Sequence, residues 1–321
     1  MSENTASILD RLRRNSFRQM LYGWGARANI PYSILRTVSD SVSAAGHLRE
    51  YTERKSLAQR VLAQHTPQTR MTRDKGYLLL DDNTIPELSA FIASGQRIYE
   101  QKKGQIAIPP GEPFTNILTA EEFRADEALW ALAVSPTLIG ILSDYLGSIP
   151  RLRYVQIWYS EPVDTPFESM LYHLDRPYFG HLGLCINLID TTAHQGPFTF
   201  LPRSATSQLR KAISYDHRYS LGKGRISDQE IASHVSANEI VSLIGPAGSA
   251  GIVDTSNCFH LGSRCESGVR VMAQLRYTLA HTTKRVSSGV FDGHPYGNDR
   301  VRMLLLDGAQ PGTPGNIEPV L

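Results

Sequence analysis

The stretch "LYHLDRPYFGHLGLCINLID", residues 171–190, decides how the chain is interpreted. It contains three side chains that can bind a metal, His173, Asp175 and His181, directly ahead of an apolar run. Residues i and i+2 of an extended strand point to the same face, so an extended "MLYHLD" places His173 and Asp175 side by side. His181 follows a Pro and a Gly, so strand alternation cannot be carried to it. We expect His181 in a loop or behind the ligands.

A third ligand has to come from a distant part of the chain, and "GIVDTSNCFHLGSR", residues 251–264, offers His260 after an apolar strand and a turn. Two histidines and one carboxylate that leave the remaining coordination positions open are typical of non-haem Fe(II) oxygenases. The spacing therefore predicts a metal site formed by His173, Asp175 and His260.

Arg270 follows on the apolar run "GVRVMAQLRY", where a partly buried guanidinium requires an anionic partner. The planar fork of arginine suits a carboxylate, which it can bind through two parallel hydrogen bonds. We expect that partner to be the second carboxylate of a 2-oxoglutarate cosubstrate. An internal salt bridge with an acidic residue is the alternative.

Composition and charge restrict the class of protein. The 321 residues can form one large domain with an appendage, and the net charge of +2 gives no reason to expect a nucleic-acid partner. Cys185, Cys258 and Cys265 form no Cys-x-x-Cys pair, which indicates buried thiols in a reducing compartment. No secretory signal or transmembrane run is evident, so we expect a cytoplasmic protein.

The order of the predicted elements is helices first and strands second. Residues 1–70 are predicted to be a helical N-terminal extension, and residues 71–321 the main domain. "TAEEFRADEALWALAVSPTLIGILSDYLG" predicts two helices, with N-caps at Thr119 and Ser135 and a stop at Gly147. From Arg151 onward, short β-rich runs with Gly, Pro, Asp and Ser in the turns favour a sandwich or barrel. The tail after about residue 287 is expected to be irregular.

The first 25 residues alternate apolar and basic side chains at helical spacing. A helix packed on the main domain is one interpretation. A basic amphipathic helix that makes peripheral contact with an anionic membrane is the other.

The order of several short motifs is similar to that of a known family. "YLGSIPRLRYVQIWYS", "YHLD", "CINLIDTTAHQGPFTFLPRSAT" and "FHLGS…GVR" follow one another, and together they resemble the phytanoyl-CoA dioxygenase family. The resemblance extends over residues 75–281 and excludes residues 1–70. It implies a mainly β fold with flanking helices around a double-stranded β-helix, the jelly-roll or cupin-like core. It also implies an Fe(II)- and 2-oxoglutarate-dependent dioxygenase that uses O2.

Carried over residue by residue, the resemblance assigns iron to His173, Asp175 and His260, and the C5 carboxylate of 2-oxoglutarate to Arg270. It also implies hydroxylation of an unactivated C–H bond, with 2-oxoglutarate converted to succinate and CO2. Related halogenases have a small residue at the carboxylate position, whereas this chain has Asp175, so we expect no halogenation.

The chain departs from the family in two places. It has "PRSA", residues 202–205, where the family usually has "PGSH", and Met272 where a Ser often follows the cosubstrate arginine. Another donor must therefore assist Arg270. Gln156 and Asn187 are polar residues on otherwise apolar strands, and we consider them candidates for contact with the cosubstrate.

The substrate is expected to be a small, anionic molecule, because three arginines lie close in sequence to the metal motifs: Arg176, Arg203 and Arg264. Tyr178 and Phe179 directly follow the His-x-Asp motif. Members of the family act on acyl-CoA, amino-acid derivatives, phosphonates, sugar acids and specialised metabolites, and we favour a sugar acid or a similar anionic metabolite.

Two other functions stay open. Cys258, His260 and Cys265 could form part of a zinc site, although their spacing is unusual for zinc. A catalytically inactive β-helix that acts as a binding module is the second alternative. "GPAGSAG", residues 245–251, precedes a strand and is interpreted as a tight turn, not as a nucleotide-binding loop.

Overall fold

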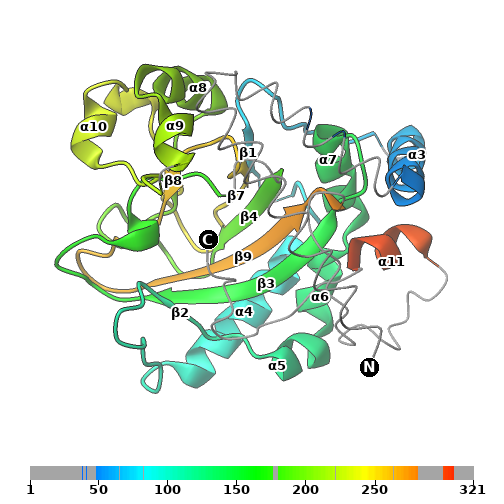
Figure 1. Cartoon of the computed structure of the whole chain (residues 1–321). Coiled ribbons are helices and arrows are strands. Elements are labelled where there is room, and N and C mark those ends of the chain that lie inside the picture. The colour runs from blue at the N-terminus through cyan, green and yellow to red at the C-terminus, as the bar shows by residue number, and fades with distance from the viewer. Residues whose placement is uncertain are drawn as a thin grey trace, which may run out of the picture.

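The computed structural model describes Val38, Ser41 and residues 48–64, 66–81, 83–175, 180–220, 222–262, 264–280 and 299–306. The helix predicted within residues 1–25 lies outside this part of the chain, as do Arg176, Tyr178 and Phe179. Two antiparallel sheets lie between two groups of helices (Figure 1).

The larger sheet has six strands in the order β1-β7-β4-β9-β3-β2, and each neighbouring pair is antiparallel. In that order the strands are β1 (Tyr77–Leu80), β7 (Ala250–Asp254), β4 (His181–Asn187), β9 (Arg270–Thr278), β3 (Arg151–Ser160) and β2 (Thr115–Asn116). The long strands β3 and β9 pair along most of their length, from Arg151 opposite Thr278 to Ser160 opposite Arg270.

The smaller sheet has the order β6-β5-β8, with β6 (Val241–Ser242), β5 (Thr199–Phe200) and β8 (His260–Leu261). Isolated bridges extend it, because His173 pairs with His260 and Tyr172 pairs with Ile226. From β3 to β9 the chain passes repeatedly between the two sheets. This confirms the predicted mainly β fold with flanking helices and a double-stranded β-helix core.

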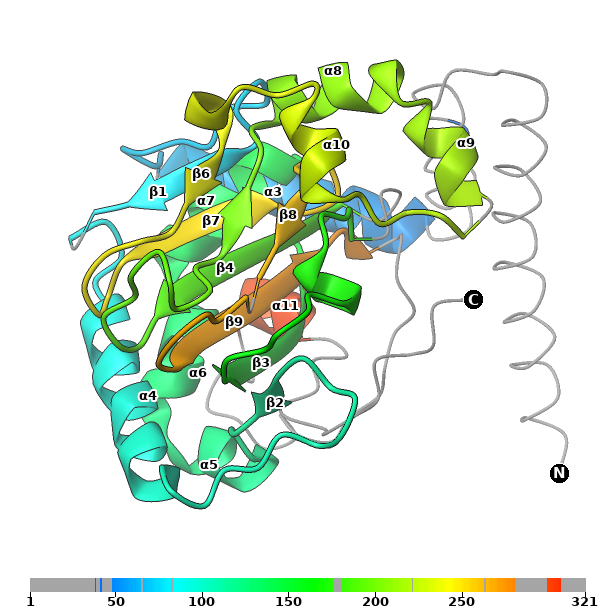
Figure 2. The same ribbon diagram turned by 90° about the vertical axis from the view of Figure 1, so that its left-hand side faces the viewer.

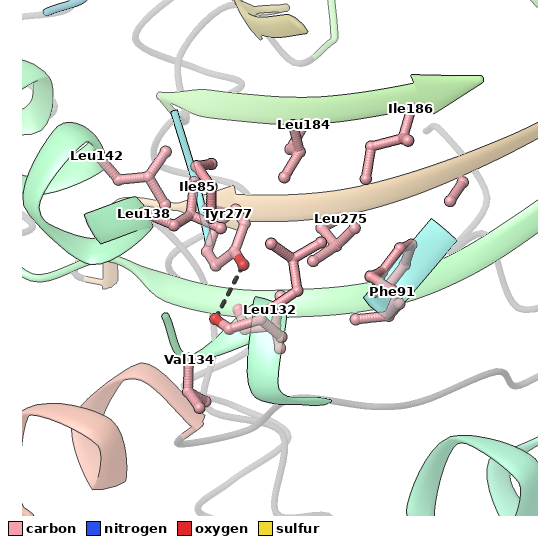
Figure 3. Close-up of a cluster of buried hydrophobic side chains, with 14 of the residues drawn as sticks. Ile85, Phe91, Leu132, Val134, Leu138, Leu142, Leu184, Ile186, Leu275 and Tyr277 are labelled. Atoms are coloured by element: carbon pink, nitrogen blue, oxygen red, sulfur yellow. Dashed lines mark hydrogen bonds between the residues drawn. The ribbon is translucent and has the colours of Figure 1, made fainter. Parts of the chain in front are cut away.

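One face of the larger sheet forms the main hydrophobic core. Alternate residues of β9, Val271, Ala273, Leu275 and Tyr277, point into this core and are almost completely buried. Figure 3 shows Leu275 and Tyr277 beside Leu184 of β4 and apolar side chains of the covering helices. These helices are α4 (Leu88–Lys102), α5 (Ala120–Ala125), α6 (Glu127–Ala133) and α7 (Pro136–Leu146).

The region from Thr119 to Gly147 forms three helices, so the prediction of two is wrong in number. The predicted caps at Thr119 and Ser135 and the left-handed Gly147 are present. The additional break is at Asp126, whose extended backbone ends α5 and whose side chain accepts a hydrogen bond from the N–H of Ala128 to begin α6.

The segment Glu127–Leu146 is long and apolar enough to cross a membrane by composition. Its most apolar part is 72% buried within the protein, and it consists of two helices, α6 and α7. Burial of this kind is typical of core helices.

The outer face of the smaller sheet is covered by three short helices that the sequence did not predict (Figure 2). They are α8 (Arg203–Ala212), α9 (Tyr215–Ser220) and α10 (Asp228–Ala232). They enclose a second apolar cluster that includes Tyr172, Phe259 and Leu261. Two single turns, η1 (Glu168–Met170) and η2 (Ala237–Glu239), complete the elements of this region.

Two further helices join the main core. α3 (Leu48–Gln64) packs against α7 and buries Leu57 and Ala58. α11 (Arg300–Leu306) buries its last three leucines, so the prediction of an irregular tail is wrong for this segment. The boundary at residue 70 stays a prediction.

Candidate metal centre

The structure brings together the three predicted ligands. His173, Asp175 and His260 each offer one ligand atom, and these atoms all lie within 4.8 Å of one another. The Nε2 atom of His260 is 3.2 Å from Oδ2 of Asp175, and Nε2 of His173 is 3.8 Å from Oδ1. Within the described residues, this is the group of His, Cys, Asp and Glu side chains that could hold a metal ion.

Backbone pairing places the ligands. The N–H of His173 donates to the carbonyl of His260 and the N–H of His260 donates to the carbonyl of His173, both at 3.0 Å. Asp175 is held two residues further on, where its N–H donates to the carbonyl of Thr255 at 2.9 Å. The extended backbone at residues 173–175 therefore directs both side chains to one face, as the i, i+2 spacing predicts.

Both imidazole rings are oriented by a backbone carbonyl. Nδ1 of His173 lies 2.8 Å from the carbonyl oxygen of Leu171, and Nδ1 of His260 lies 3.0 Å from that of Cys258. A carbonyl only accepts, so each Nδ1 carries the proton and each Nε2 presents a lone pair toward the cluster. Burial, and after it the neighbouring His260, lowers the pKa of His173 well below its ordinary value. The neutral ring is the form that binds a metal.

Arg276 on β9 holds the carboxylate ligand, a role that the sequence analysis missed. Its Nη1 donates to Oδ2 of Asp175 and, at 2.8 Å, to Oγ1 of Thr255. Burial alone would raise the pKa of Asp175, but the charge of Arg276 outweighs it and holds this pKa well below its ordinary value. His181, the first residue of β4, places Nδ1 3.5 Å from the same guanidinium, which agrees with the expectation that it lies behind the ligands.

Arg270 is buried at the start of β9, with its guanidinium beside the end of β8. Nη1 donates to the carbonyl of Gly196 at 2.9 Å. A Cβ added at Gly262, two residues after His260, would lie 2.9 Å from the same nitrogen. Burial lowers the pKa of Arg270 to about 10, so the group stays cationic at neutral pH. The structure thus places a buried cation near the predicted ligands, and its role in cosubstrate binding stays a prediction.

Gly196 belongs to the "GP" turn of the sequence, and a side chain does not fit there. Its φ of +64° lies in the left-handed region, and an added Cβ would be 2.7–2.8 Å from the backbone of Arg264 and Cys265. The close approach of two backbones at Gly196 fixes the carbonyl that holds Arg270.

Gln156 lies on the same face of the larger sheet as Arg276, opposite Gln274 on β9. Gln274 itself accepts hydrogen bonds from Oη of Tyr154 at 3.1 Å and from Nε1 of Trp158 at 3.3 Å. Gln274 therefore fixes two aromatic side chains on the face of β3 that also carries Gln156. The contact of Gln156 with the cosubstrate stays a prediction.

Asn187, at the end of β4, is completely buried and lies opposite Met272. Its amide Nδ2 donates to the carbonyl of Leu243 at 3.0 Å. One of its donor positions thus serves to connect the two sheets, and its contact with the cosubstrate stays a prediction.

Two of the three arginines that motivated an anionic substrate have internal partners. Nη1 of Arg203 donates to Oη of Tyr145 at 3.4 Å. Nη1 of Arg264 lies 2.5 Å from Oδ2 of Asp228, and its Nε donates to a backbone carbonyl. Neither is presented as an exposed cation at the metal cluster, and Arg176 lies outside the described residues.

The side chains of the alternative zinc site do not come together. The three cysteines are free and buried, as predicted. Sγ of Cys258 lies 3.5 Å from the carbonyl of Gly76, and Sγ of Cys265 lies 3.3 Å from the carbonyl of Gln195. Each thiol packs against a different backbone segment, whereas His260 faces His173 and Asp175.

No family model matches the chain, and no curated protein matches it. Among solved structures it is similar to the non-haem α-ketoglutarate-dependent carbocyclase SnoK from nogalamycin biosynthesis, with 20% identity, 69% of this chain and 86% of that chain covered, and a TM-score of 0.43. It is similar to EctD from S. alaskensis with bound Fe, with 17% identity, coverage of 77% and 90%, and a TM-score of 0.47. It is also similar to HygX from Streptomyces hygroscopicus with nickel and 2-oxoglutarate bound, with 12% identity, coverage of 65% and 88%, and a TM-score of 0.43.

Proposed function

We propose that the protein is a mononuclear Fe(II)- and 2-oxoglutarate-dependent dioxygenase that hydroxylates an unactivated C–H bond of a small molecule. The observation that carries the proposal is the cluster of His173, Asp175 and His260, whose ligand atoms lie within 4.8 Å of one another. Two imidazole nitrogens and one carboxylate occupy one side of a metal ion and suit Fe(II), with positions left for cosubstrate and O2.

The bound iron and 2-oxoglutarate supply the oxidising chemistry, in which R–H, O2 and 2-oxoglutarate yield R–OH, succinate and CO2. The protein supplies position and charge. Leu171 and Cys258 orient the two imidazoles through their carbonyls, and Arg276 orients the carboxylate. Each of these partners is of the kind that raises metal affinity by fixing a ligand in place.

Arg270 is proposed to bind the C5 carboxylate of 2-oxoglutarate. It is a buried cation close to Gly262, only two residues beyond the ligand His260. A charge-assisted, two-point contact with a carboxylate would offset the desolvation of this guanidinium.

We also propose that the substrate is anionic, with a sugar acid preferred, and that the protein belongs to the phytanoyl-CoA dioxygenase family. We further propose a cytoplasmic location and peripheral membrane contact through residues 1–25. Cell fractionation of the full chain and of a form that lacks residues 1–25 tests the last two. Membrane association that requires residues 1–25 supports the docking helix.

The function is tested by succinate release from the purified protein, reconstituted with Fe(II) and supplied with 2-oxoglutarate and O2. Acyl-CoA thioesters, amino-acid derivatives, phosphonates and sugar acids serve as candidate substrates. His173→Ala removes a proposed ligand, and His194→Ala is the matched control, because His194 is exposed and pairs with Glu266.

Succinate release by the wild type and by the control, but not by His173→Ala, is the expected result. Iron-loaded, folded protein that releases no succinate with any compound would contradict the proposal and favour the inactive binding module.

A further inference from the structure

The position of Arg225 is fixed by backbone pairing at the edge of the smaller sheet. The N–H of Ile226 donates to the carbonyl of Tyr172 at 2.9 Å, and the two residues form an antiparallel bridge. His173 forms the next bridge, with His260. Antiparallel register therefore places Arg225 opposite the proposed ligand His173.

Alternation along these two segments gives the direction of the side chains. Tyr172 and Ile226 both belong to the apolar cluster beneath α8, α9 and α10. Their neighbours His173 and Arg225 consequently lie on the opposite face, toward the metal cluster.

Arg225 is accessible and weakly paired. Its side chain is 39% exposed, and Nη2 lies 3.4 Å from Oε2 of Glu168, whose side chain is 71% exposed. An ion pair of this length between exposed groups stabilises little. By contrast, Arg264 lies 2.5 Å from Asp228, and Arg270 and Arg276 are buried.

We propose that Arg225 binds the acid group of the substrate, a carboxylate or a phosphate or sulfate ester, in place of Glu168. This inference rests on the proposed oxygenase function and deepens it. Opposite residues in an antiparallel pair have Cβ atoms about 5 Å apart, so Arg225 is a near neighbour of the proposed ligand His173. Arg225 thereby selects short anionic substrates whose reacting carbon is a few bonds from the acid.

The test compares the wild type, Arg225→Gln and Arg97→Gln. Arg97 is the matched control, because it is exposed and ion-paired with Asp126 on the helical side of the molecule. Each protein is loaded anaerobically with Fe(II) and 2-oxoglutarate, and formation of this complex is checked by its visible absorption band. Failure of the band in the wild type overturns the proposed function itself and is distinct from the outcomes below.

The first probe is inorganic phosphate, observed by the broadening of its ³¹P resonance by the nearby Fe(II). We expect broadening in the wild type and in Arg97→Gln, and a binding constant weakened by about tenfold or more in Arg225→Gln, as for loss of a charge-assisted contact. Absence of broadening in the wild type, or equal binding in Arg225→Gln, overturns the assignment.

The second probe is a set of small carboxylic acids and phosphate esters, each paired with its uncharged amide or alcohol, in the succinate-release assay. We expect acids to stimulate release, and Arg225→Gln to raise their KM about tenfold while the KM for 2-oxoglutarate is unchanged. Stimulation by uncharged compounds alone, or an unchanged KM for the acids, overturns the assignment.

Discussion

The two faces of the larger sheet differ in chemistry although the same strands form both. On β9, Val271, Ala273, Leu275 and Tyr277 point into the helix-covered core, as Figure 3 shows for the last two. The alternate residues Arg270, Met272, Gln274 and Arg276 point to the opposite face of the sheet.

Adjacent residues of β9 therefore have different roles: those on one face contribute to stability, and those on the other contribute to the proposed chemistry. The helix-covered face of the larger sheet, here called its outer face, buries apolar surface, which stabilises folding. The opposite face, here called its inner face, buries two guanidinium groups. Each is held by specific partners: Gly196 for Arg270, and Asp175 and Thr255 for Arg276. We therefore expect substitutions on the outer face to change the free energy of unfolding, and substitutions on the inner face to change iron or cosubstrate binding.

The largest effect is expected for Asp175→Ala. The change removes one of three proposed ligands, so iron content and succinate release should fall to background, while circular dichroism reports a folded protein. Loss of the partner of Arg276 should also reduce stability, by less than the roughly 3–5 kcal/mol typical of a fully buried pair, since Asp175 is half-buried. Full turnover in folded Asp175→Ala would contradict the metal assignment.

Leu275→Ala tests the outer face. Leu275 is completely buried, and removal of a buried leucine lowers the free energy of unfolding by about 2–5 kcal/mol. Urea denaturation measures the change. The affinity of the folded variant for 2-oxoglutarate should equal that of the wild type, and a marked loss would show that the two faces are not separable.

Arg276→Gln tests the support of the carboxylate ligand. Loss of the contacts with Asp175 and Thr255 should weaken iron binding by about 10–100-fold, the range found when partners behind metal ligands are removed. Competition with a coloured chelator measures the affinity. Thr255→Val should give a smaller loss in the same direction, and wild-type affinity in both variants would mean that Asp175 needs no support.

Gly262→Ala tests the proposed cosubstrate position without removing a charge. The added Cβ would lie 2.9 Å from Nη1 of Arg270, so the guanidinium must move, and 2-oxoglutarate should bind about tenfold more weakly. Gly183→Ala is the matched control, because its Cβ would lie 3.6 Å from Gln274, an ordinary contact. Equal affinities in the two variants would place the cosubstrate away from Arg270.

Tyr277→Phe should have the smallest effect. The buried Tyr277 hydroxyl donates to the carbonyl of Ala133 at 2.9 Å (Figure 3), and loss of this bond lowers the free energy of unfolding by about 0.5–1.5 kcal/mol. Thermal denaturation measures the change. Altered iron affinity in Tyr277→Phe would again break the separation of the two faces.

The sequence predicts the proposed ligands well because strand alternation is a strong local rule. His173 and Asp175 are two residues apart, and His260 follows a recognisable strand and turn, so little long-range information is needed. The β runs between residues 151 and 278 were found for the same reason.

The sequence does not reveal contacts that depend on register between distant strands. The pairing of Arg276 with Asp175 requires β9 to lie beside the segment at residue 175, although the alternation from Arg270 through Gln274 to Arg276 was a usable signal. Asp126 is missed as an N-cap because it lies within a run of good helix formers, residues 120–133, that is otherwise typical of a single helix. The short helices α8 to α10 escaped prediction because they depend on packing over the smaller sheet.

The most direct test of the central claim is an anaerobic titration of Fe(II) into the purified protein with 2-oxoglutarate present, followed by visible absorption. We expect a weak band that requires both iron and 2-oxoglutarate, is absent in His173→Ala and persists in the exposed-site control His194→Ala. A folded, iron-loaded wild type that shows no 2-oxoglutarate-dependent band would contradict the claim that His173, Asp175 and His260 form an Fe(II)/2-oxoglutarate centre.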